Sequence, residues 1–512
     1  MTLPPELDWF GSVLERGSMA LSRPRRLAAN LASGDHDDAR LLECRRHQNG
    51  KETVVFEVRA ERPQDLQADI RRWEPMAARF GAADDSHPCL FAMREDFPET
   101  PHQYAVLAGQ PRSPCVDDRP WADARSTWTP LSFVERIKWW LGAAARGALA
   151  DDAQAVDPLF VPLGPDVAVP RDLLRPDGPE GAILSPGVGG ERAWLYHLRP
   201  GRPAGAQVAW RTIAIRLPPQ AMRTLRIAPQ DLSQLVAALD GCGFDLVRCL
   251  RKAVLDTPLT GAEPRLALLV VTPVMRAKGG PVAAEDVQMF GISIELGDLG
   301  MRLGVFDKNP GYDATSPGKG SRYGRRLAPV EPDGLEEVGL QTMPVHVDFD
   351  RELAGTCAGS ATPDIRRVVL AGAGAIGAHL AMALAREGRF RWTIVDDDHL
   401  LPHNLARHTL GRPHLGALKC DALAFEIGLL LCDREAARGL ACNVIFPGKR
   451  APELEAALRD ADIVIDATAS VAAGRSLSDA GGQARRASVF LNPTGTAAVL
   501  LSEDAARGIR LD

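Results

Sequence analysis

Three glycines follow a short apolar run in the last third of the chain. Residues 366–371 (RRVVLA) have the composition of a buried strand, Gly372, Gly374 and Gly377 come next, and HLAMALAREG continues as a helix. Glycines here let the main chain approach a phosphate that a Cβ would block, and the helix start offers free N–H donors. A second strand, RWTIVDDD, reaches Asp396 19 residues past the last glycine, where an acid holds ribose hydroxyls. The pattern predicts a nucleotide site, and an NAD(P) oxidoreductase would fit it equally well.

The residues after this second strand favour a different chemistry. Asp398, Asn404, Arg407 and Lys419 follow Asp396 in a single run, VDDDHLLPHNLARHTLGRPHLGALKC (395–420). Hydride transfer needs no such cluster. Activation of a carboxylate by ATP does, because negative charge builds on the α-phosphate, where basic, amide and metal-bound groups stabilise it. The run therefore favours an adenylating enzyme over a dehydrogenase.

These residues resemble a known family in type, order and spacing. A D-x-D, then N-L-x-R, then G-x-x-K is the pattern of the ThiF, MoeB and ubiquitin-activating enzymes, and the resemblance covers about residues 361–500. It implies that ATP is bound by the three glycines, with Asp396 on the ribose and Asp398 in the second acidic position. It also implies that Asn404, Arg407 and Lys419 contact the phosphates, with Arg407 and Lys419 acting in catalysis.

The sequence departs from this family at the position of the metal ligand. Relatives carry a magnesium-binding aspartate in a T-D-N-like triplet, whereas this chain has Ala469 there and Asp466 three residues earlier. Two alternatives stay open. Asp466 holds Mg²⁺ and acts in catalysis through a shifted geometry, or it only ends the strand in DADIVIDATAS (460–470).

Cysteines mark two further departures. Many sulfur-carrier activators bind zinc through CxxC pairs, and this chain has none, so we expect no zinc. The sequence ends at Asp512, soon after the strand-like ASVFLNPTG, while relatives continue with more sheet and a thioester-forming cysteine. We expect the adenylation domain to be incomplete at its C-terminus, or that cysteine to lie elsewhere. Cys420 and Cys432 fall on an expected helix, where we expect buried structural thiols.

A second set of motifs lies near the N-terminus. In order they are Phe97, Pro98 and Pro101; Cys115, Val116 and Asp117; Trp128 and Pro130; and Asp157, Pro158 and Leu159. They resemble the ubiquitin-conjugating fold, with its F-P-x-x-P turn, active cysteine, W-x-P helix start and D-P-L continuation. The resemblance covers roughly residues 1–162 and implies that Cys115 accepts an acyl group as a thioester. A turn-rich segment without apolar periodicity is also consistent with an exposed thiol at Cys115.

The expected oxyanion donor is missing from this second region. The conjugating family places H-P-N before its cysteine, and this chain has only PHQY and GQPRSP. His102 or Gln103 are the substitutes that the sequence offers. Asp117 and Asp118 could deprotonate an attacking amine, although acids in a loop are more often only solvated.

Loop-rich stretches divide the chain. Segments rich in Pro and Gly at 158–191 and 307–334 separate three expected domains: a ubiquitin-conjugating-like α+β domain (1–162), an α/β linker domain (163–360) and a Rossmann-like ThiF adenylation domain (361–512). The linker shows helical stretches near 229–240 and 243–254 and strand-like runs at 265–273, 287–296 and 301–306. No spacing of residues within it points to chemistry.

Composition limits the remaining possibilities. The 512 residues are 45% hydrophobic and 25% charged, as in ordinary globular proteins, and the net charge of −6 gives no general attraction to nucleic acid. No segment has the length and apolarity of a membrane span, and the N-terminus lacks signal-peptide character. We therefore expect a cytoplasmic α/β protein with neither nucleic acid nor membrane as a partner.

Together, the two resemblances imply a fused enzyme. The combination is similar to bacterial activating and conjugating enzymes of antiphage operons such as CBASS. It implies that ATP and Mg²⁺ serve to activate the C-terminus of a ubiquitin-like or other partner protein, which passes through Cys115 to a target amine. A homodimer is also expected. The alternative is a sulfur-carrier activator like ThiF or MoeB whose N-terminal domain only docks the carrier.

Overall fold

The structure, a computed structural model, describes most of the chain. The described residues are 9–34, 37–83, 85–106, 110–149, 156–179, 181–186, 195–201, 208–222, 225–257, 265–276, 278–309, 322–360, 362–504, 508 and 510–511. The chain divides into two compact units, Met1–His346 and Val347–Asp512, and each is treated by itself.

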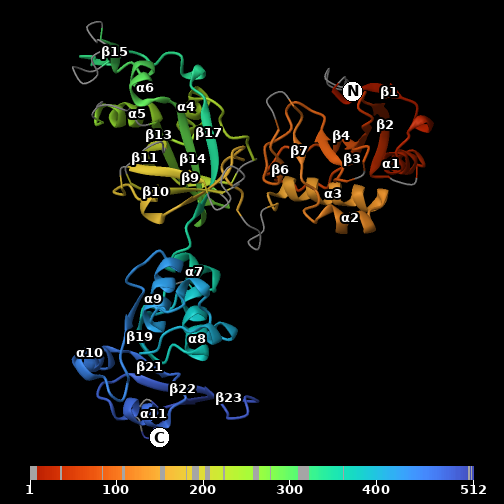
Figure 1. Cartoon of the computed structure of the whole chain (residues 1–512). Coiled ribbons are helices and arrows are strands. Elements are labelled where there is room, and N and C mark those ends of the chain that lie inside the picture. Colours follow the sequence, from red (N-terminus) through yellow and green to blue (C-terminus); the bar gives the residue numbers. More distant parts are fainter. Residues whose placement is uncertain are drawn as a thin grey trace. The chain divides into compact units, whose positions relative to one another are not determined.

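The first unit begins with an antiparallel sheet whose five strands lie side by side in chain order (Figure 1). The strands are β1 (Ser12–Leu14), β2 (Ala39–Arg46), β3 (Glu52–Arg59), β4 (Trp73–Phe80) and β5 (Cys89–Ala92). Side chains of β3 alternate between the two faces. Val54, Phe56 and Val58 pack in the main core, and Val55 packs in a smaller cluster on the other face.

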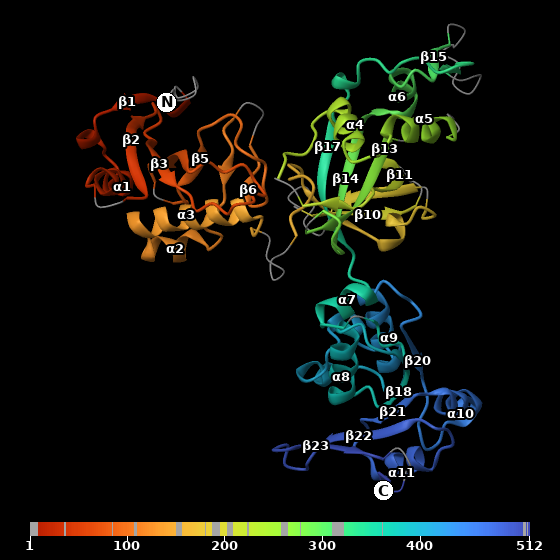
Figure 2. The same ribbon diagram turned by 180° about the vertical axis from the view of Figure 1, so that it is seen from behind.

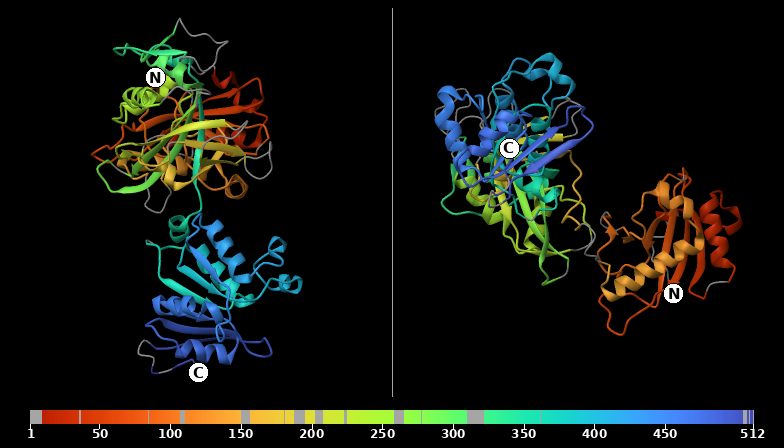
Figure 3. Two further views of the ribbon diagram at one scale, coloured as in Figure 1. Left: turned by 60° about the vertical axis from the view of Figure 1, so that its left-hand side comes forward. Right: turned by 90° about the horizontal axis from the view of Figure 1, so that it is seen from below.

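Two helices, α1 (Ser22–Ala32) and α3 (Pro130–Arg146), cover the face that holds the main core. Figure 3 (right) shows α3, in orange, crossing the strands of this sheet. Thr129 caps α3 by accepting a hydrogen bond from the Ser132 N–H, Pro130 occupies the first turn, and Gly147 ends the helix at φ 68°. The W-x-P helix start expected from the sequence is therefore confirmed.

A short hairpin and a short helix lie between the sheet and α3 in the sequence. Strand β6 (Gln103–Tyr104) pairs with β7 (Ser113–Pro114), so that Gln103 lies opposite Pro114 and Tyr104 opposite Ser113. Helix α2 (Trp121–Thr127) follows. The hairpin places Cys115 directly after its second strand.

The rest of the first unit is built on a sheet that closes on itself. The sheet contains β8 (Asp166–Val169), β9 (Gly181–Pro186), β10 (Leu195–Pro200), β11 (Val208–Arg216), β12 (Gln220–Ala221), β13 (Arg265–Met275), β14 (Val282–Glu295) and β17 (Leu340–Val347). Its order is β11-β9-β10-β8-β17-β14-β13-β12, and a further pairing joins β11 to β13. The expected mixture of helices and strands is present, and the closure into a barrel was not predicted.

Strand β13 is buried on both of its faces. Ala267 and Leu269 pack in the cluster that contains Trp210, Met289 and Met343. Leu266, Leu268 and Val270 pack in a second cluster with the helices α4 (Leu232–Asp240), α5 (Leu246–Leu255) and α6 (Leu296–Arg302). This arrangement explains the continuous apolar run of β13, which is typical of a strand without a solvent-facing side.

The expected strand at 301–306 was wrong. Residues 296–302 form α6, and only the last residue of the expected run begins β15 (Phe306–Lys308), which pairs with β16 (Tyr323–Arg325). Leu296, Leu299 and Leu303 recur at helical spacing and are fully buried. Glycines between these leucines obscured the helical period in the sequence.

The second unit is an open α/β sheet of six strands. They are β18 (Arg367–Ala371), β19 (Arg391–Val395), β20 (Ala437–Leu440), β21 (Ile463–Asp466), β22 (Arg485–Leu491) and β23 (Ala498–Ser502). The order is β20-β19-β18-β21-β22-β23, in which the first five strands are parallel and β23 is antiparallel. The strand order reverses on either side of β18, which creates a crevice at the carboxyl ends of the strands.

Helices cover both faces of this sheet (Figures 1 and 2). On one face lie α7 (Arg351–Cys357), α8 (Ala375–Arg386) and α9 (Lys419–Leu430), and on the other lie α10 (Ala451–Asp460) and α11 (Val471–Asp479). Val368 and Leu370 of β18 point to the first set and Val369 to the second. The expected Rossmann-like fold is therefore confirmed. Among the described helices, none is long and apolar enough to cross a membrane.

Helix α7 begins before the expected domain boundary at residue 361. Arg351 donates hydrogen bonds to the Gly388 and Phe390 carbonyls, and Ala354 is fully buried in the core of the α/β sheet. The second unit accordingly begins at Val347. The division into domains at 162 and 360 stays a prediction.

Candidate functional site

The glycine-rich turn lies between β18 and α8, and each of its three glycines has a different constraint. Gly372 has φ 92°, and a Cβ on it would lie 2.9 Å from the Ala467 carbonyl carbon. A Cβ on Gly377 would lie 2.0 Å from the Gly372 carbonyl oxygen. A Cβ on Gly374 would meet nothing within 4 Å. Gly372 and Gly377 are therefore required by the fold, whereas Gly374 borders open space and lines a cavity.

Asp396 fixes the shape of this turn. One carboxylate oxygen accepts a hydrogen bond of 2.6 Å from the Ala373 N–H, and the other accepts one of 2.8 Å from the Asp398 N–H. Burial raises the pKa of this carboxyl. Each oxygen keeps a second lone pair, so the same carboxylate can still accept a hydroxyl hydrogen from a ligand.

Lys419 lies at the start of α9, with its side chain held beside the glycine turn. Its Nζ donates to an Asp398 carboxylate oxygen at 2.8 Å, and only 9% of its side chain is exposed compared with 72% for Asp398. Both residues line one cavity of 280 Å³ together with Gly372, Gly374 and Asp396. The structure therefore brings five of the predicted site residues together around a partly buried positive charge.

Asn404 and Arg407 lie on the next segment and have other surroundings. Asn404 is buried in the short helix η6 (Pro402–Ala406), where its side-chain oxygen accepts a hydrogen bond from the Leu401 N–H. Arg407 ends that helix and is exposed. In the described part of the chain, neither residue lines the 280 Å³ cavity. Their contacts with the phosphates stay a prediction.

His408 ties this segment to the glycine turn, a role that the sequence did not reveal. Its Nε2 is 2.7 Å from the Ala373 carbonyl oxygen, and its Nδ1 accepts a hydrogen bond from the Leu410 N–H. Burial lowers the pKa of this imidazole, so the neutral ring is favoured. The neighbouring motif residue Arg407 is the one signal in the sequence that points to this position.

The carboxylate of Asp466 is held by side chains and main chain at the end of β21. One oxygen accepts hydrogen bonds from the Thr468 N–H at 2.9 Å and the Thr468 hydroxyl at 2.7 Å, and the other accepts one from the Ser488 hydroxyl at 3.1 Å. Asp466 is 3% exposed, and it is not one of the described residues that line the 280 Å³ cavity. Ala469, at the position of the usual metal ligand, has φ 54°.

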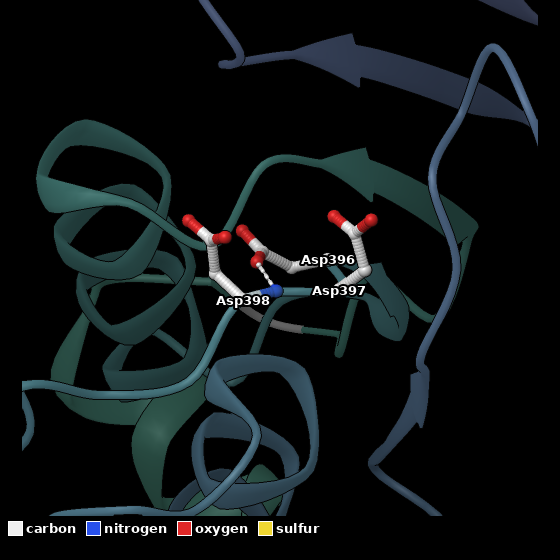
Figure 4. A group of neighbouring side chains, drawn as sticks. All are labelled: Asp396, Asp397 and Asp398. Atoms are coloured by element: carbon white, nitrogen blue, oxygen red, sulfur yellow. Dashed lines mark hydrogen bonds between the residues drawn. The ribbon is translucent and has the colours of Figure 1, made fainter.

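Three consecutive aspartates provide another set of hard oxygen donors. Asp396, Asp397 and Asp398 each offer one carboxylate oxygen within 4.8 Å of the others (Figure 4). All three line the 280 Å³ cavity. Carboxylate oxygens are the protein ligands that Mg²⁺ prefers, so the chemistry of this donor set fits a metal carried by a nucleotide.

Cysteines of the second unit were expected to be buried where they fall on a helix, and one of the two is not. Cys420 is fully buried on α9, and burial raises the pKa of its thiol to about 12, as expected for a structural thiol. Cys432 is exposed beyond the end of α9, with φ 51°, so the expectation of a buried thiol was wrong for this residue. Cys442 was not predicted and lines the 280 Å³ cavity.

Cys115 in the first unit borders a second candidate site. Its N–H donates to the His102 carbonyl at 2.8 Å, and its Sγ donates to the Tyr104 hydroxyl oxygen at 3.3 Å. It lines a cavity of 440 Å³ with His102, Asp118, Trp139 and other residues. The thiol is half-buried instead of exposed, and burial raises its pKa.

The acids beside Cys115 are not equivalent. Asp117 accepts two hydrogen bonds of 2.9 Å from the Arg119 guanidinium and lies 3.3 Å from that of Arg136, and the Arg119 bond lowers the pKa of its carboxyl. Asp118 is exposed and faces the 440 Å³ cavity. A carboxylate that two guanidiniums hold ionised is a weak base, so Asp118 is the better candidate for taking a proton.

Gln103, one of the two expected oxyanion donors, points away from the cysteine. Its amide nitrogen donates to the Pro98 carbonyl at 2.9 Å and to the Thr100 hydroxyl at 3.0 Å, and the residue is 1% exposed. It is therefore part of the packing below the hairpin, and of the two substitutes that the sequence offers, Gln103 does not face the cysteine. His102 lines the cavity.

With both sites described, similarity to known families can be assigned. Residues 44–173 match prokaryotic E2 family A, and residues 364–498 match the ThiF family. A ubiquitin-conjugating-type domain thus precedes a ThiF-type domain in one chain, as the sequence motifs predicted.

Two curated relatives share a name that refers to ubiquitin transfer. The chain is 27% identical over 404 residues to the ATP-dependent ubiquitin transferase-like protein Cap2 of Enterobacter hormaechei subsp. hoffmannii, a match that covers 70% of this chain and 62% of the relative. A protein of the same name from Pseudomonas aeruginosa is 35% identical over 143 residues, 27% of this chain and 24% of that protein. The chain thus spans less than two thirds of the relatives it matches.

Solved structures also match part of the chain. E. coli MccB with ATP is 19% identical, with a TM-score of 0.21, and the match covers 25% of this chain and 37% of MccB. E. coli TcdA, a tRNA threonylcarbamoyladenosine dehydratase, is 24% identical with a TM-score of 0.20 over 22% of this chain and 45% of TcdA.

Proposed function

We propose that this chain activates the C-terminal carboxylate of a partner protein with ATP and passes the acyl group through Cys115 to an amine. The observation that carries the proposal is that one chain holds both a glycine-turn cavity with Lys419 and a cavity bordered by the conjugating-type cysteine. Either site alone fits several functions. The two in one chain match the two halves of acyl activation and transfer.

The glycine turn and Lys419 would carry the first step. The N–H groups at the start of α8 and the space beside Gly374 receive phosphates, and Asp396 accepts a ribose hydroxyl. A carboxylate oxygen of the partner attacks the α-phosphorus, and pyrophosphate leaves. Lys419 exchanges Asp398 for phosphate oxygens and stabilises the charge that builds there, and Arg407 and Asn404 would join it from their segment.

Mg²⁺ would neutralise phosphate charge and orient the leaving pyrophosphate. The cluster of Asp396, Asp397 and Asp398 fits this ion, because its oxygens are close together and line the cavity. Asp466 fits it less well. The residue is 3% exposed, and it is absent from the described lining of the 280 Å³ cavity that the three aspartates share.

Cys115 would carry the second step. Its thiolate attacks the acyl carbon, either of the adenylate, from which AMP departs, or of a thioester on another cysteine, from which that thiolate departs. Either route leaves a thioester on Sγ. An amine entering the 440 Å³ cavity then attacks the same carbon, the C–S bond breaks, and the amine gives up its proton to Asp118 or to water. The products are an amide and the free thiol. Tethering both steps in one chain raises the effective concentration of the acceptor thiol.

The partners follow from this chemistry and from the relatives. The activated protein is a ubiquitin-like or other protein with a free C-terminus, and the printed name of the Cap2 relatives, ATP-dependent ubiquitin transferase-like, supports that class. A role in bacterial antiviral defence is part of the proposal, and the resemblance to enzymes of antiphage operons supports it. A homodimer is part of the proposal, and the exposed Phe425 and Leu429 on one side of α9 offer an apolar surface for it.

Incubation of the chain with MgATP and each small protein encoded beside its gene tests both steps. Pyrophosphate exchange measures adenylation, and non-reducing gels detect a thiol-sensitive adduct. We expect the adduct to disappear in Cys115→Ala and to persist in Cys89→Ala, a matched control because Cys89 is an exposed cysteine of the same domain. An adduct that survives in Cys115→Ala would favour the sulfur-carrier activator. Absence of exchange with every candidate would overturn the adenylation step.

A further inference from the structure

We infer that the Tyr104 hydroxyl is the side-chain donor that stabilises the oxyanion and the departing thiolate during acyl transfer at Cys115. The inference rests on the proposed function, since it concerns the thioester formed there. It assigns to Tyr104 the role for which the sequence offered only His102 and Gln103.

The β6–β7 hairpin fixes the position of this hydroxyl. Tyr104 lies opposite Ser113, and the Cys115 N–H bonds to the His102 carbonyl, so the hairpin pairing continues up to the cysteine. The result is a distance of 3.3 Å between the Tyr104 oxygen and Sγ. Among the described residues, the Tyr104 hydroxyl is the side-chain group that could donate a hydrogen bond to this sulfur at such a distance.

Two other polar groups near the sulfur, the Gln103 amide and the His102 carbonyl, are engaged in other hydrogen bonds. Gln103 is turned into the core, and the His102 carbonyl accepts from the Cys115 N–H. Burial raises the pKa of the Cys115 thiol, and a main-chain hydrogen bond from Asp117, a second donor, opposes that rise. One phenol O–H and one main-chain N–H thus approach the sulfur, which is the usual composition of an oxyanion hole.

The hydroxyl is free to donate once the thiol proton is gone. In the free protein the S–H donates to the phenol oxygen, and a hydroxyl hydrogen can rotate toward a new acceptor. Burial and the neighbouring thiol raise the pKa of Tyr104, so the phenol keeps its proton at neutral pH. The carbonyl oxygen of a thioester is one bond beyond the carbon attached to Sγ, within reach of the same donor.

The two cavities around the pair leave room for the acceptor. Tyr104 lines a smaller cavity of 190 Å³, and Cys115 lines the one of 440 Å³; Val116, Asp117 and Arg136 border both. The phenol therefore reaches Sγ from the smaller cavity, while the larger one stays open to an amine. When the amine attacks, negative charge moves to the carbonyl oxygen and then, as the C–S bond breaks, to Sγ, and Tyr104 can donate to each in turn.

Loading Cys115 without ATP isolates this step. A fluorescent Gly–Gly-terminated peptide thioester of mercaptoethanesulfonate exchanges with the Cys115 thiol of the full chain, which releases mercaptoethanesulfonate. Free lysine is then added, and decay of the adduct gives a first-order discharge rate constant. Cys115→Ala gives the background from other cysteines, and Tyr196→Phe is the matched control because it removes a phenol hydroxyl in the barrel.

We expect Tyr104→Phe to discharge about 100-fold more slowly than the wild type, the usual effect of removing one oxyanion donor. The midpoint of the pH dependence of iodoacetamide alkylation at Cys115 should also move upward, because the thiolate loses a hydrogen bond. Partial unfolding would lower the amplitude of decay and leave the rate constant unchanged. Discharge within twofold of the wild type would overturn the role of Tyr104. Failure of the proposed function would appear separately, as a wild-type chain that forms no ATP-dependent adduct.

Discussion

The nucleotide cavity and the Cys115 cavity are built from different parts of the chain. The first lies at the carboxyl ends of parallel strands, where main-chain groups, glycines and short acids define it. The second lies beside a two-stranded hairpin, and the side chains of α3, such as Trp139 and Arg136, form its wall. A site made of main chain leaves a fixed spacing in the sequence. In a site made of packed side chains, the nucleophile is the feature that the sequence pattern reveals most directly.

Gly377→Ala should have the largest effect and should affect only the nucleotide site. The new Cβ would lie 2.0 Å from the Gly372 carbonyl oxygen, so the α/β unit must distort, at a cost of about 4 kcal/mol in its free energy of unfolding. Calorimetry should show the loss in the transition of this unit. Gly374→Ala is the matched control, because its Cβ meets open space: it should keep the fold and weaken ATP binding. Equal stability of the two variants would contradict this difference.

Lys419→Ala should come next, and its effect should be on rate. Removing a charge at the α-phosphate should lower pyrophosphate exchange about 100-fold. The fold should persist because the partner left behind, Asp398, has 72% of its side chain exposed to water. Loading of Cys115 from a preformed peptide thioester should be unchanged. Parallel loss of ATP-independent loading would show that the two sites are not separable.

Gln103→Ala tests whether the Cys115 site depends on packing below the hairpin. It leaves the Pro98 carbonyl and the Thr100 hydroxyl without their buried donor, at a cost of about 2 kcal/mol. The alkylation rate of Cys115 should change because β6 also carries Tyr104. Pyrophosphate exchange serves as the internal reference and should stay at the wild-type value. An unchanged alkylation rate would mean that the hairpin holds the cysteine without Gln103.

His408 should give the smallest effect, seen in the dependence of stability on pH. Burial lowers its pKa in the folded protein, so between that value and the unfolded value of about 6.5 the unfolded chain binds more protons. The contribution of His408 to stability is therefore fully present above about pH 6.5 and is lost as the pH falls below it. Urea unfolding of the wild type and His408→Gln from pH 8 to 5 should converge at low pH. Parallel curves would rule out this titration.

The same contrast explains which expectations succeeded. Strand, glycine turn and helix at 366–386 were readable because two of the glycines meet main-chain needs: Gly372 has φ 92°, and Gly377 lies against the Gly372 carbonyl. The strand expected at 301–306 failed because glycines between Leu296, Leu299 and Leu303 hid a helical period. The closure of the barrel by β11 and β13 joins residues 55 positions apart, such as Trp210 and Arg265, and no local pattern encodes such a pairing.

Residue types at short spacing were enough to locate the two candidate sites: a glycine turn followed by acids and Lys419, and a cysteine among conjugating-type motifs. Which side chains meet at each site depends on the folded chain. In the fold, the Gln103 side chain points into the core, and the Tyr104 hydroxyl lies 3.3 Å from the Cys115 sulfur. The Asp466 carboxylate accepts hydrogen bonds from hydroxyl groups, and Asp398 pairs with Lys419. Those contacts depend on hairpin register and on strands that are distant in the sequence, which residue spacing alone does not record.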